Sequence, residues 1–226
     1  MMMVSPVVSR SGGGPASGVL AARGLACRRG RRLLFRGLDF TLAPGSVTWL
    51  RGTNGSGKTS LMRMLAGLSE PAEGSITWND LPVRSARADA RRGVVYIGHS
   101  NALKDDLTLA ESVAFLAVLA EVDEPAARAQ RALDRLGLAS RRDAPVRTLS
   151  QGQRRRGALA RLALDDAPRT WILDEPFDAL DAASVDLLSR LIEAHAARGG
   201  AVLLTSHQAI RLAGAQEFDL EPWRAA

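Results

Sequence analysis

Cysteine, lysine and tyrosine are nearly absent from this chain of 226 residues. One cysteine, Cys27, excludes an internal disulfide and is typical of a reducing compartment; we expect it to be a small buried residue. Only two of the 30 basic side chains are lysines, Lys58 and Lys104, so the net charge of +6 comes almost entirely from arginine. Few aromatic residues lie between the scattered arginines, so we expect solvated surface or a contact with an anionic membrane or protein partner, and no nucleic acid.

Long apolar runs are also missing. The most apolar run, residues 113–120, is far shorter than the roughly 20 residues needed to cross a bilayer. The first residues carry no long apolar core followed by a cleavage site, so a signal peptide is not expected. These absences predict a cytoplasmic protein without a transmembrane segment, so any membrane partner must be a separate chain.

What the chain does have is a phosphate-binding loop. Residues 52–59 match the pattern G-x-x-x-x-G-K-[ST] without a mismatch. The apolar residues 46–50 predict a strand before the loop, and residues 60–66 predict a helix after it, which is the context that the motif requires. The loop therefore predicts binding of a nucleoside triphosphate.

Each residue type in the loop has a chemical reason. The glycines allow a tight curl in which several backbone N–H groups face the phosphates. Lys58 is expected to contact the β- and γ-phosphates, and the Thr59 hydroxyl is expected to ligate Mg²⁺. The predicted nucleotide-binding residues of this region are Gly52, Thr53, Asn54, Gly55, Ser56, Gly57, Lys58, Thr59 and Ser60.

Polar residues follow several apolar runs, which predict parallel strands buried on both faces. Because ligands bind beyond the carboxyl ends of such strands, we expect His99, Asp174, Glu175 and His207 to approach the phosphate-binding loop and Lys58. Asp174 is predicted to hold Mg²⁺ through water, and Glu175 to orient or deprotonate the attacking water. His207 could reach the γ-phosphate. The simpler alternative for Asp174 and Glu175 is a strand-end turn with a helix cap. The simpler alternative for His207 is an ordinary histidine at a strand end.

The remaining pattern predicts one domain. Residues 1–18 are rich in Ser, Gly and Pro and predict a disordered N-terminal extension. Residues 19–226 predict a single α/β domain that begins with antiparallel strands over residues 19–44. Apolar residues at helical spacing predict a helical subdomain over about residues 100–165. After it, a helix over residues 182–197 is expected to end with an exposed His195.

Three further motifs resemble those of ABC transporter nucleotide-binding domains. Residues 149–153 resemble the Leu-Ser-Gly-Gly-Gln signature, with Gln151 in place of the first glycine. Residues 173–181 resemble the Walker B and D-loop block, and residues 205–207 the switch histidine. This resemblance implies a P-loop NTPase fold of the α/β class, with an antiparallel β subdomain and a helical subdomain. It implies ATP hydrolysis with Mg²⁺, in which Glu175, His207 and Lys58 are catalytic.

The resemblance also implies a second copy of the chain. In the family, the signature stands at a helix N-terminus and faces the γ-phosphate of ATP bound by the other copy. Two domains thus enclose two nucleotides. The residues expected to act in this way are Ser150, Gln151, Gly152 and Gln153, and the resemblance assigns Asp181 to the D-loop.

A narrower resemblance rests on residues 96–104 and 107–112, in which Gly98-His99 stands where most ABC domains have the glutamine of the Q-loop. These stretches resemble the ATP-binding subunits of cytochrome c maturation heme exporters. The implied partners are the integral membrane subunits of that exporter, at the cytoplasmic face of the inner membrane. The implied role is release of the holo heme chaperone.

Departures from the family pattern fall near the nucleotide. Arg29 occupies the position of the usual aromatic residue that stacks on adenine, and a guanidinium can also stack on a base. His99 could contact the water shell of Mg²⁺. Asp178 stands where Ser or Thr is usual, and the sequence offers no account of it. Phe35 is expected in the core.

Other functions remain open at this stage. The same ATPase could serve a drug, lipid or lipoprotein exporter, against which the His99 stretch argues. A soluble nucleic-acid-associated ABC protein usually carries two ATPase domains or a long insertion, which this sequence lacks. A degenerate module without turnover is disfavoured because Lys58, Asp174, Glu175 and His207 are all present.

Substitution of Lys58 by alanine is expected to abolish nucleotide binding, because the loop then loses the one mobile cation that contacts the phosphates. Equilibrium titration with ATP measures this directly. Lys104→Ala, which removes the only other lysine, is the matched control and should bind as the wild type does. Unchanged affinity in the Lys58 variant would contradict the assignment.

Overall fold

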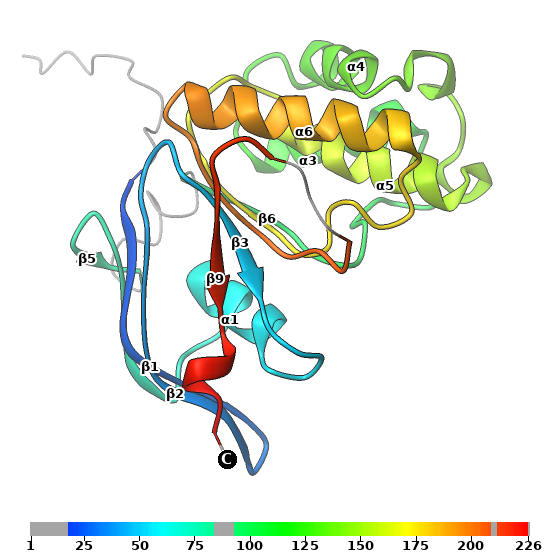
Figure 1. Cartoon of the computed structure of the whole chain (residues 1–226). Helices are drawn as coiled ribbons and strands as arrows, with labels where there is room; N and C mark the ends of the chain where they lie inside the picture. The colour runs from blue at the N-terminus through cyan, green and yellow to red at the C-terminus, as the bar shows by residue number, and fades with distance from the viewer. Residues whose placement is uncertain (1–17, 84–92, 209–211, 226) are drawn as a thin grey trace, which may run out of the picture.

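The computed structural model describes residues 18–83, 93–208 and 212–225 (Figure 1). Most of the predicted disordered extension, residues 1–17, lies outside this range. Gly18, the last residue of that prediction, is described and is buried.

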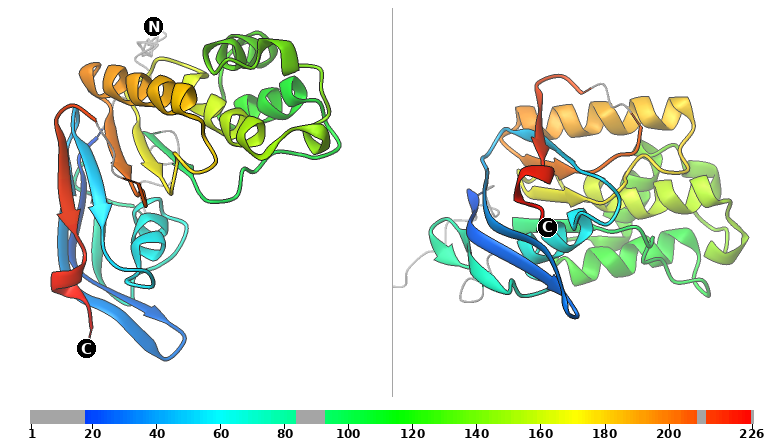
Figure 2. Two further views of the ribbon diagram at one scale, coloured as in Figure 1. Left: turned by 45° about the vertical axis from the view of Figure 1, so that its right-hand side comes forward. Right: turned by 60° about the horizontal axis from the view of Figure 1, so that its bottom comes forward.

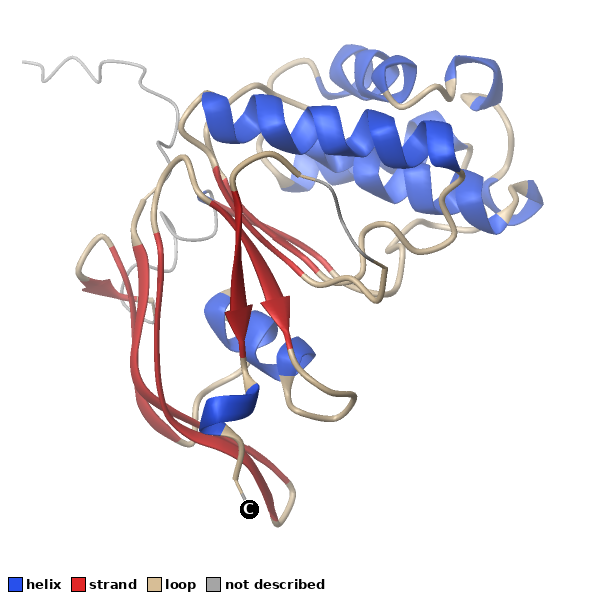
Figure 3. Cartoon of the chain, in the orientation of Figure 1, coloured by secondary structure: helices blue, strands red, loops and turns tan. Residues whose placement is uncertain are grey.

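Two sheets organise the described part of the chain (Figures 1 and 3). The antiparallel sheet has the order β2-β1-β4-β5, and the parallel sheet has the order β6-β7-β8-β3-β9. The antiparallel strands are β1 (Leu20–Arg29), β2 (Arg32–Leu42), β4 (Glu73–Trp78) and β5 (Leu81–Pro82). The parallel strands are β3 (Val47–Arg51), β6 (Val94–Ile97), β7 (Thr170–Leu173), β8 (Ala201–Leu204) and β9 (Ala215–Asp219).

Successive side chains along the parallel strands point to opposite faces of the sheet, so the interior has two hydrophobic cores. Leu203 of β8 faces a core shared with the antiparallel sheet, whereas Leu204 faces the core of the larger helical layer. Helix α1 (Lys58–Leu65) fills the space between the two sheets (Figure 2), with Leu61, Met62, Met64 and Leu65 buried. Because both faces are covered, every residue of β7 and β8 is buried, as continuous apolar runs predict.

The helices gather on the other side of the parallel sheet (Figure 3). Thr108 and Glu111 form a reciprocal capping box at the start of α3, which satisfies N–H groups that a helix start leaves open. No helix among the described residues is long and apolar enough to cross a membrane. This layer contains α3 (Leu109–Leu119), α4 (Pro125–Arg135), α5 (Gln151–Leu159), α6 (Ala182–Ala197) and the short 3₁₀ turns η1 (Ala139–Arg141), η2 (Val146–Thr148) and η3 (Ala160–Ala163).

The structure corrects the expectation for His195 and adds a strand. Strand β9 was not predicted, because its Ala-Gln-Glu-Phe-Asp sequence has neither a continuous nor an alternating apolar pattern.

His195 is 1% exposed, so the prediction of an exposed side chain is wrong. Its Nε2 lies 2.7 Å from the carbonyl oxygen of Arg169, and its ring stacks on Trp171 with 3.5 Å between centroids. A side chain at Gly200 would collide with this ring.

We expect His195 to make folding stability depend on pH. Burial lowers the pKa of His195 from 6.5 to about 4, because the interior disfavours the charged ring. Above pH 6.5 the ring is neutral in both the folded and the unfolded chain, so nothing is lost there. As pH falls from 6.5 to 4, only the unfolded chain gains a proton, which removes about 2 kcal/mol of stability by pH 5.

Urea unfolding at pH 7 and pH 5 tests this dependence. His195→Phe keeps a ring on Trp171 but cannot titrate, so it should lose this part of the pH dependence. His99→Gln, at an exposed position, should retain it. An identical pH dependence in wild type and His195→Phe would contradict the assignment.

Candidate active site

The phosphate-binding loop joins β3 to α1, and two of its glycines lie too close to neighbouring side chains to carry a side chain of their own. Gly52 has φ 145°, and a Cβ there would stand 2.7 Å from Ser56 Oγ. Gly57 has φ 108°, and a Cβ there would stand 3.0 Å from the Phe35 ring, which is fully buried as predicted. Only glycine combines these backbone angles with this lack of space.

The loop presents donors to an anion. The N–H groups of Lys58, Thr59 and Ser60 open helix α1 and have no acceptor within the helix. Ser56 Oγ is buried and has no hydrogen-bond partner among the described residues. Lys58 Nζ donates to the carbonyl oxygens of Gly52 (2.8 Å) and Thr53 (3.2 Å), which holds the ammonium inside the curl. These donors fit a chain of phosphates.

Thr59 and Asp174 bring two oxygens together at the edge of the loop. Thr59 Oγ1 donates a 2.8 Å hydrogen bond to Asp174 Oδ2, although 115 positions separate the residues. Oxygen ligands of this kind suit Mg²⁺, which keeps several waters and binds through few protein groups. The pair therefore fits the predicted metal position beside the phosphates.

Glu175 lies directly beyond β7 with an unusual backbone. Its φ is 50°, in the left-handed region, and the residue is 8% exposed. His207 donates its backbone N–H to Glu175 Oε2 at 3.0 Å, and His207 Nε2 lies 3.4 Å from Oε1. Burial raises the pKa of Glu175, aided by Asp178 and Asp174, whereas the charge and N–H of His207 lower it. A raised pKa suits a group that takes a proton from water.

Thr205 fixes both carboxylate residues and was not singled out from the sequence. Its hydroxyl donates to Asp174 Oδ1 at 2.9 Å and accepts the N–H of Glu175 at 2.9 Å. The residue is fully buried where β8 ends. Its place directly after an apolar strand, next to the predicted His207, is the signal that could have identified it.

Among the described residues, no hydrogen bond or ion pair joins two other predicted residues, His99 and Arg29, to this cluster. His99 follows β6 and is exposed, and Arg29 ends β1 and is exposed on the β1–β2 hairpin. Within the described ranges, no hydrogen bond or ion pair joins Arg29 to the phosphate-binding loop.

The signature residues form the start of α5. Ser150 caps the helix by accepting the N–H of Gln153, and Gln153 Oε1 accepts the N–H of Ser150. Gly152 approaches the D-loop so closely that a Cβ would lie 2.8 Å from the carbonyl oxygen of Ala179. Asp181 caps α6 through the N–H of Ser184, which lowers the pKa of Asp181. In the described part of the chain, no hydrogen bond links residues 150–153 to the phosphate-binding loop.

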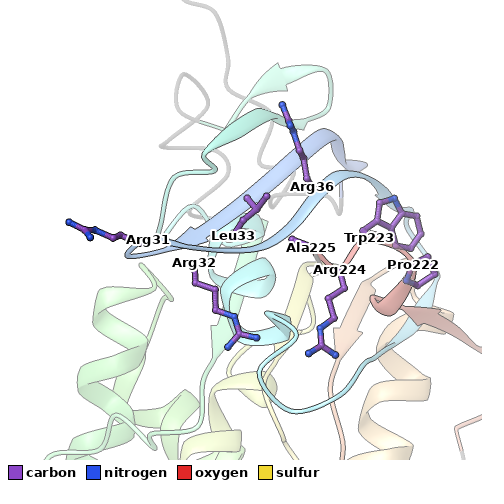
Figure 4. A pocket seen from close by; sticks show the side chains of 8 residues that line it. All are labelled: Arg31, Arg32, Leu33, Arg36, Pro222, Trp223, Arg224 and Ala225. Atoms are coloured by element: carbon purple, nitrogen blue, oxygen red, sulfur yellow. The ribbon is translucent and has the colours of Figure 1, made fainter.

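An unpredicted turn also holds the phosphate-binding loop. Glu221, in the 3₁₀ turn η4 (Glu221–Trp223), accepts the N–H (2.7 Å) and the hydroxyl (2.6 Å) of Thr53. Arg224 donates to Thr53 Oγ1 at 3.2 Å and pairs with Glu221 at 3.3 Å. Figure 4 shows Arg32 and Arg224 extending the same way at the edge of a basic hollow of about 720 Å³, lined by Arg31, Arg32, Leu33, Arg36, Pro222, Trp223, Arg224 and Ala225.

Comparison with known proteins agrees with this geometry. A family model described as ABC transporter matches residues 35–178. A solved structure of the ATP-binding subunit of an ABC transporter superposes with a TM-score of 0.74 at 26% identity, and covers 84% of this chain and 79% of its own. The fold and the site define an ATP-binding domain of the ABC class.

Curated relatives narrow the class. The cytochrome c biogenesis ATP-binding export protein CcmA of Methylococcus capsulatus is 48% identical over 195 residues, which is 86% of this chain and 94% of the relative. The protein of the same name from Aromatoleum aromaticum is 50% identical over 192 residues, covering 84% and 89%. The chain therefore belongs to the CcmA family of ABC transporter ATP-binding proteins.

Thr205→Val is expected to reduce the free energy of unfolding by about 1–3 kcal/mol, because Asp174 and the N–H of Glu175 lose a buried partner. It should also slow ATP hydrolysis. Thr170→Val is the matched control: this threonine is equally buried in β7, but its hydroxyl has no partner among the described residues. Urea unfolding of both variants checks the difference, and equal losses would refute the role of Thr205.

Proposed function

We propose that this chain is the ATP-hydrolysing subunit of a membrane ABC transporter complex for heme export in cytochrome c biogenesis. The observation that carries the proposal is the meeting of Lys58, Thr59, Asp174, Glu175 and His207 at the carboxyl edge of the parallel sheet. The names of the relatives support the biological role, since they are cytochrome c biogenesis export proteins.

In this proposal the residues of the site divide nucleotide binding, metal binding and water activation among them. Lys58 and the N–H groups at the start of α1 bind the β- and γ-phosphates of ATP, and Thr59 and Asp174 hold Mg²⁺, Asp174 through water. When bound there, Mg²⁺ would supply positive charge against the charge that develops on the phosphate oxygens. Glu175 orients the attacking water and accepts its proton, helped by the raised pKa of its carboxyl group. His207 holds Glu175 and can reach the γ-phosphate.

The site is completed by a second copy of the chain. Ser150, Gln151, Gly152 and Gln153 stand at the N-terminus of α5, where backbone N–H groups favour an anion. In our proposal they contact the γ-phosphate held by the other copy. Among the described residues of one chain, no hydrogen bond joins the signature to the phosphate-binding loop. This separation is compatible with a role of the signature across the dimer.

The membrane partners belong to the same proposal. The ATPase would sit at the cytoplasmic face of the inner membrane, bound to the integral membrane subunits of the exporter. Hydrolysis would then drive release of the holo heme chaperone. Co-purification of tagged, detergent-solubilised protein from its native cells tests this. Recovery of cytochrome c maturation membrane subunits supports it, and recovery of a different permease refutes the heme assignment.

Glu175→Gln is expected to keep ATP binding, lose nearly all hydrolysis and accumulate as a nucleotide-bound dimer, because the amide cannot take a proton from water. Steady-state turnover, ATP titration and size-exclusion chromatography with ATP measure the three effects. Glu217→Gln, which changes an exposed glutamate paired with Arg51, is the control and should behave as the wild type. Hydrolysis at the unaltered rate by the Glu175 variant would disprove the role of this residue.

A further inference from the structure

A buried arginine on the signature helix contacts the ends of two catalytic strands. Arg155 lies on α5 and is 4% exposed. One terminal nitrogen, Nη1, donates to the carbonyl oxygen of Gly98 at 3.0 Å and lies 3.5 Å from Asn101 Oδ1. The other, Nη2, donates to the carbonyl oxygens of Asp174 (2.9 Å) and Glu175 (2.6 Å). The planar fork therefore spans the ends of β6 and β7.

These contacts complete the fixation of Glu175. Its N–H is held by Thr205, its carboxylate by His207, and its carbonyl oxygen by Arg155. A non-glycine residue with φ 50° is strained and persists only where neighbouring groups enforce it. Arg155 is the one of these three groups that belongs to the helical layer.

The charge of Asp178 also acts on this guanidinium. Burial lowers the pKa of Arg155, and the carboxylates of Asp178, Asp174 and Glu175, in that order of effect, raise it. A buried cation needs negative charge nearby, because its hydration is lost. Asp178 therefore supplies part of the negative charge that stabilises this guanidinium.

We propose that Arg155 is a positioning residue for ATP hydrolysis, which fixes Glu175 and the Gly98–His99 strand end relative to the signature motif at the start of α5. The inference rests on the proposed function, since it requires Glu175 to activate the water. Ser150 caps the helix that carries Arg155, so displacement of the signature by a nucleotide on the other copy displaces this guanidinium as well. Hydrolysis by Glu175 thereby depends on how the signature of its own chain is engaged.

The test compares Arg155→Gln with Arg156→Gln, which removes a charge from the next position of the same helix. ATP affinity is measured by equilibrium titration, kcat and KM by steady-state turnover with Mg²⁺ and ATP, and folding by thermal unfolding. Arg155→Gln should lower kcat by about tenfold or more while ATP affinity stays within about threefold of the wild type. Arg156→Gln should change neither quantity. Arg155→Lys should recover only part of kcat, because one ammonium cannot span both strand ends.

Three outcomes separate the possibilities. Equal kcat values for the Arg155 and Arg156 variants, with Glu175→Gln inactive, would overturn this inference and leave the proposed function intact. Parallel losses of affinity, kcat and melting temperature in both Arg155 variants would also overturn it, since they indicate a role in folding alone. Full activity of Glu175→Gln would overturn the role of Glu175 in the proposed function and this inference with it. Added to Glu175→Gln, Arg155→Gln should cause no further loss of hydrolysis.

Discussion

Burial of the parallel sheet on both faces is the constraint on which the rest of this structure depends. Helix α1 and the antiparallel sheet cover one face, and the helical layer covers the other. Charged side chains are therefore absent from β6, β7 and β8 and follow the ends of these strands. The candidate catalytic residues lie at that edge because the buried strands themselves consist almost entirely of apolar residues.

Much of this arrangement could be predicted from the sequence, because it depends on local patterns. The continuous apolar runs identified β6, β7 and β8, helical periodicity identified the region of α3 and α4, and the loop motif identified the start of α1. The antiparallel and helical parts of the ABC fold were also expected and are confirmed by the structural relatives. The roles of Lys58, Glu175 and His207 in hydrolysis remain predictions.

What the sequence could not supply depends on contacts between distant residues. Strand β9 has a polar sequence at the edge of the sheet, so its strand character arises from pairing with β3 rather than from an apolar pattern. His195 ends a helix and is surrounded by polar and small residues in the sequence, yet Trp171 and Gly200 enclose it in space. Arg155 stands in a run of three arginines, and only the fold separates this buried member from its neighbours.

The hydrogen bonds from Thr53 to Glu221 join residues 168 positions apart. During synthesis the phosphate-binding loop leaves the ribosome long before the turn that holds it, and before strand β9, which pairs with the strand preceding the loop. Domains fold largely as units as the chain is made. The loop therefore acquires its final set of contacts only after nearly all of the described chain has been translated, so an incomplete nascent chain does not yet carry the finished nucleotide site.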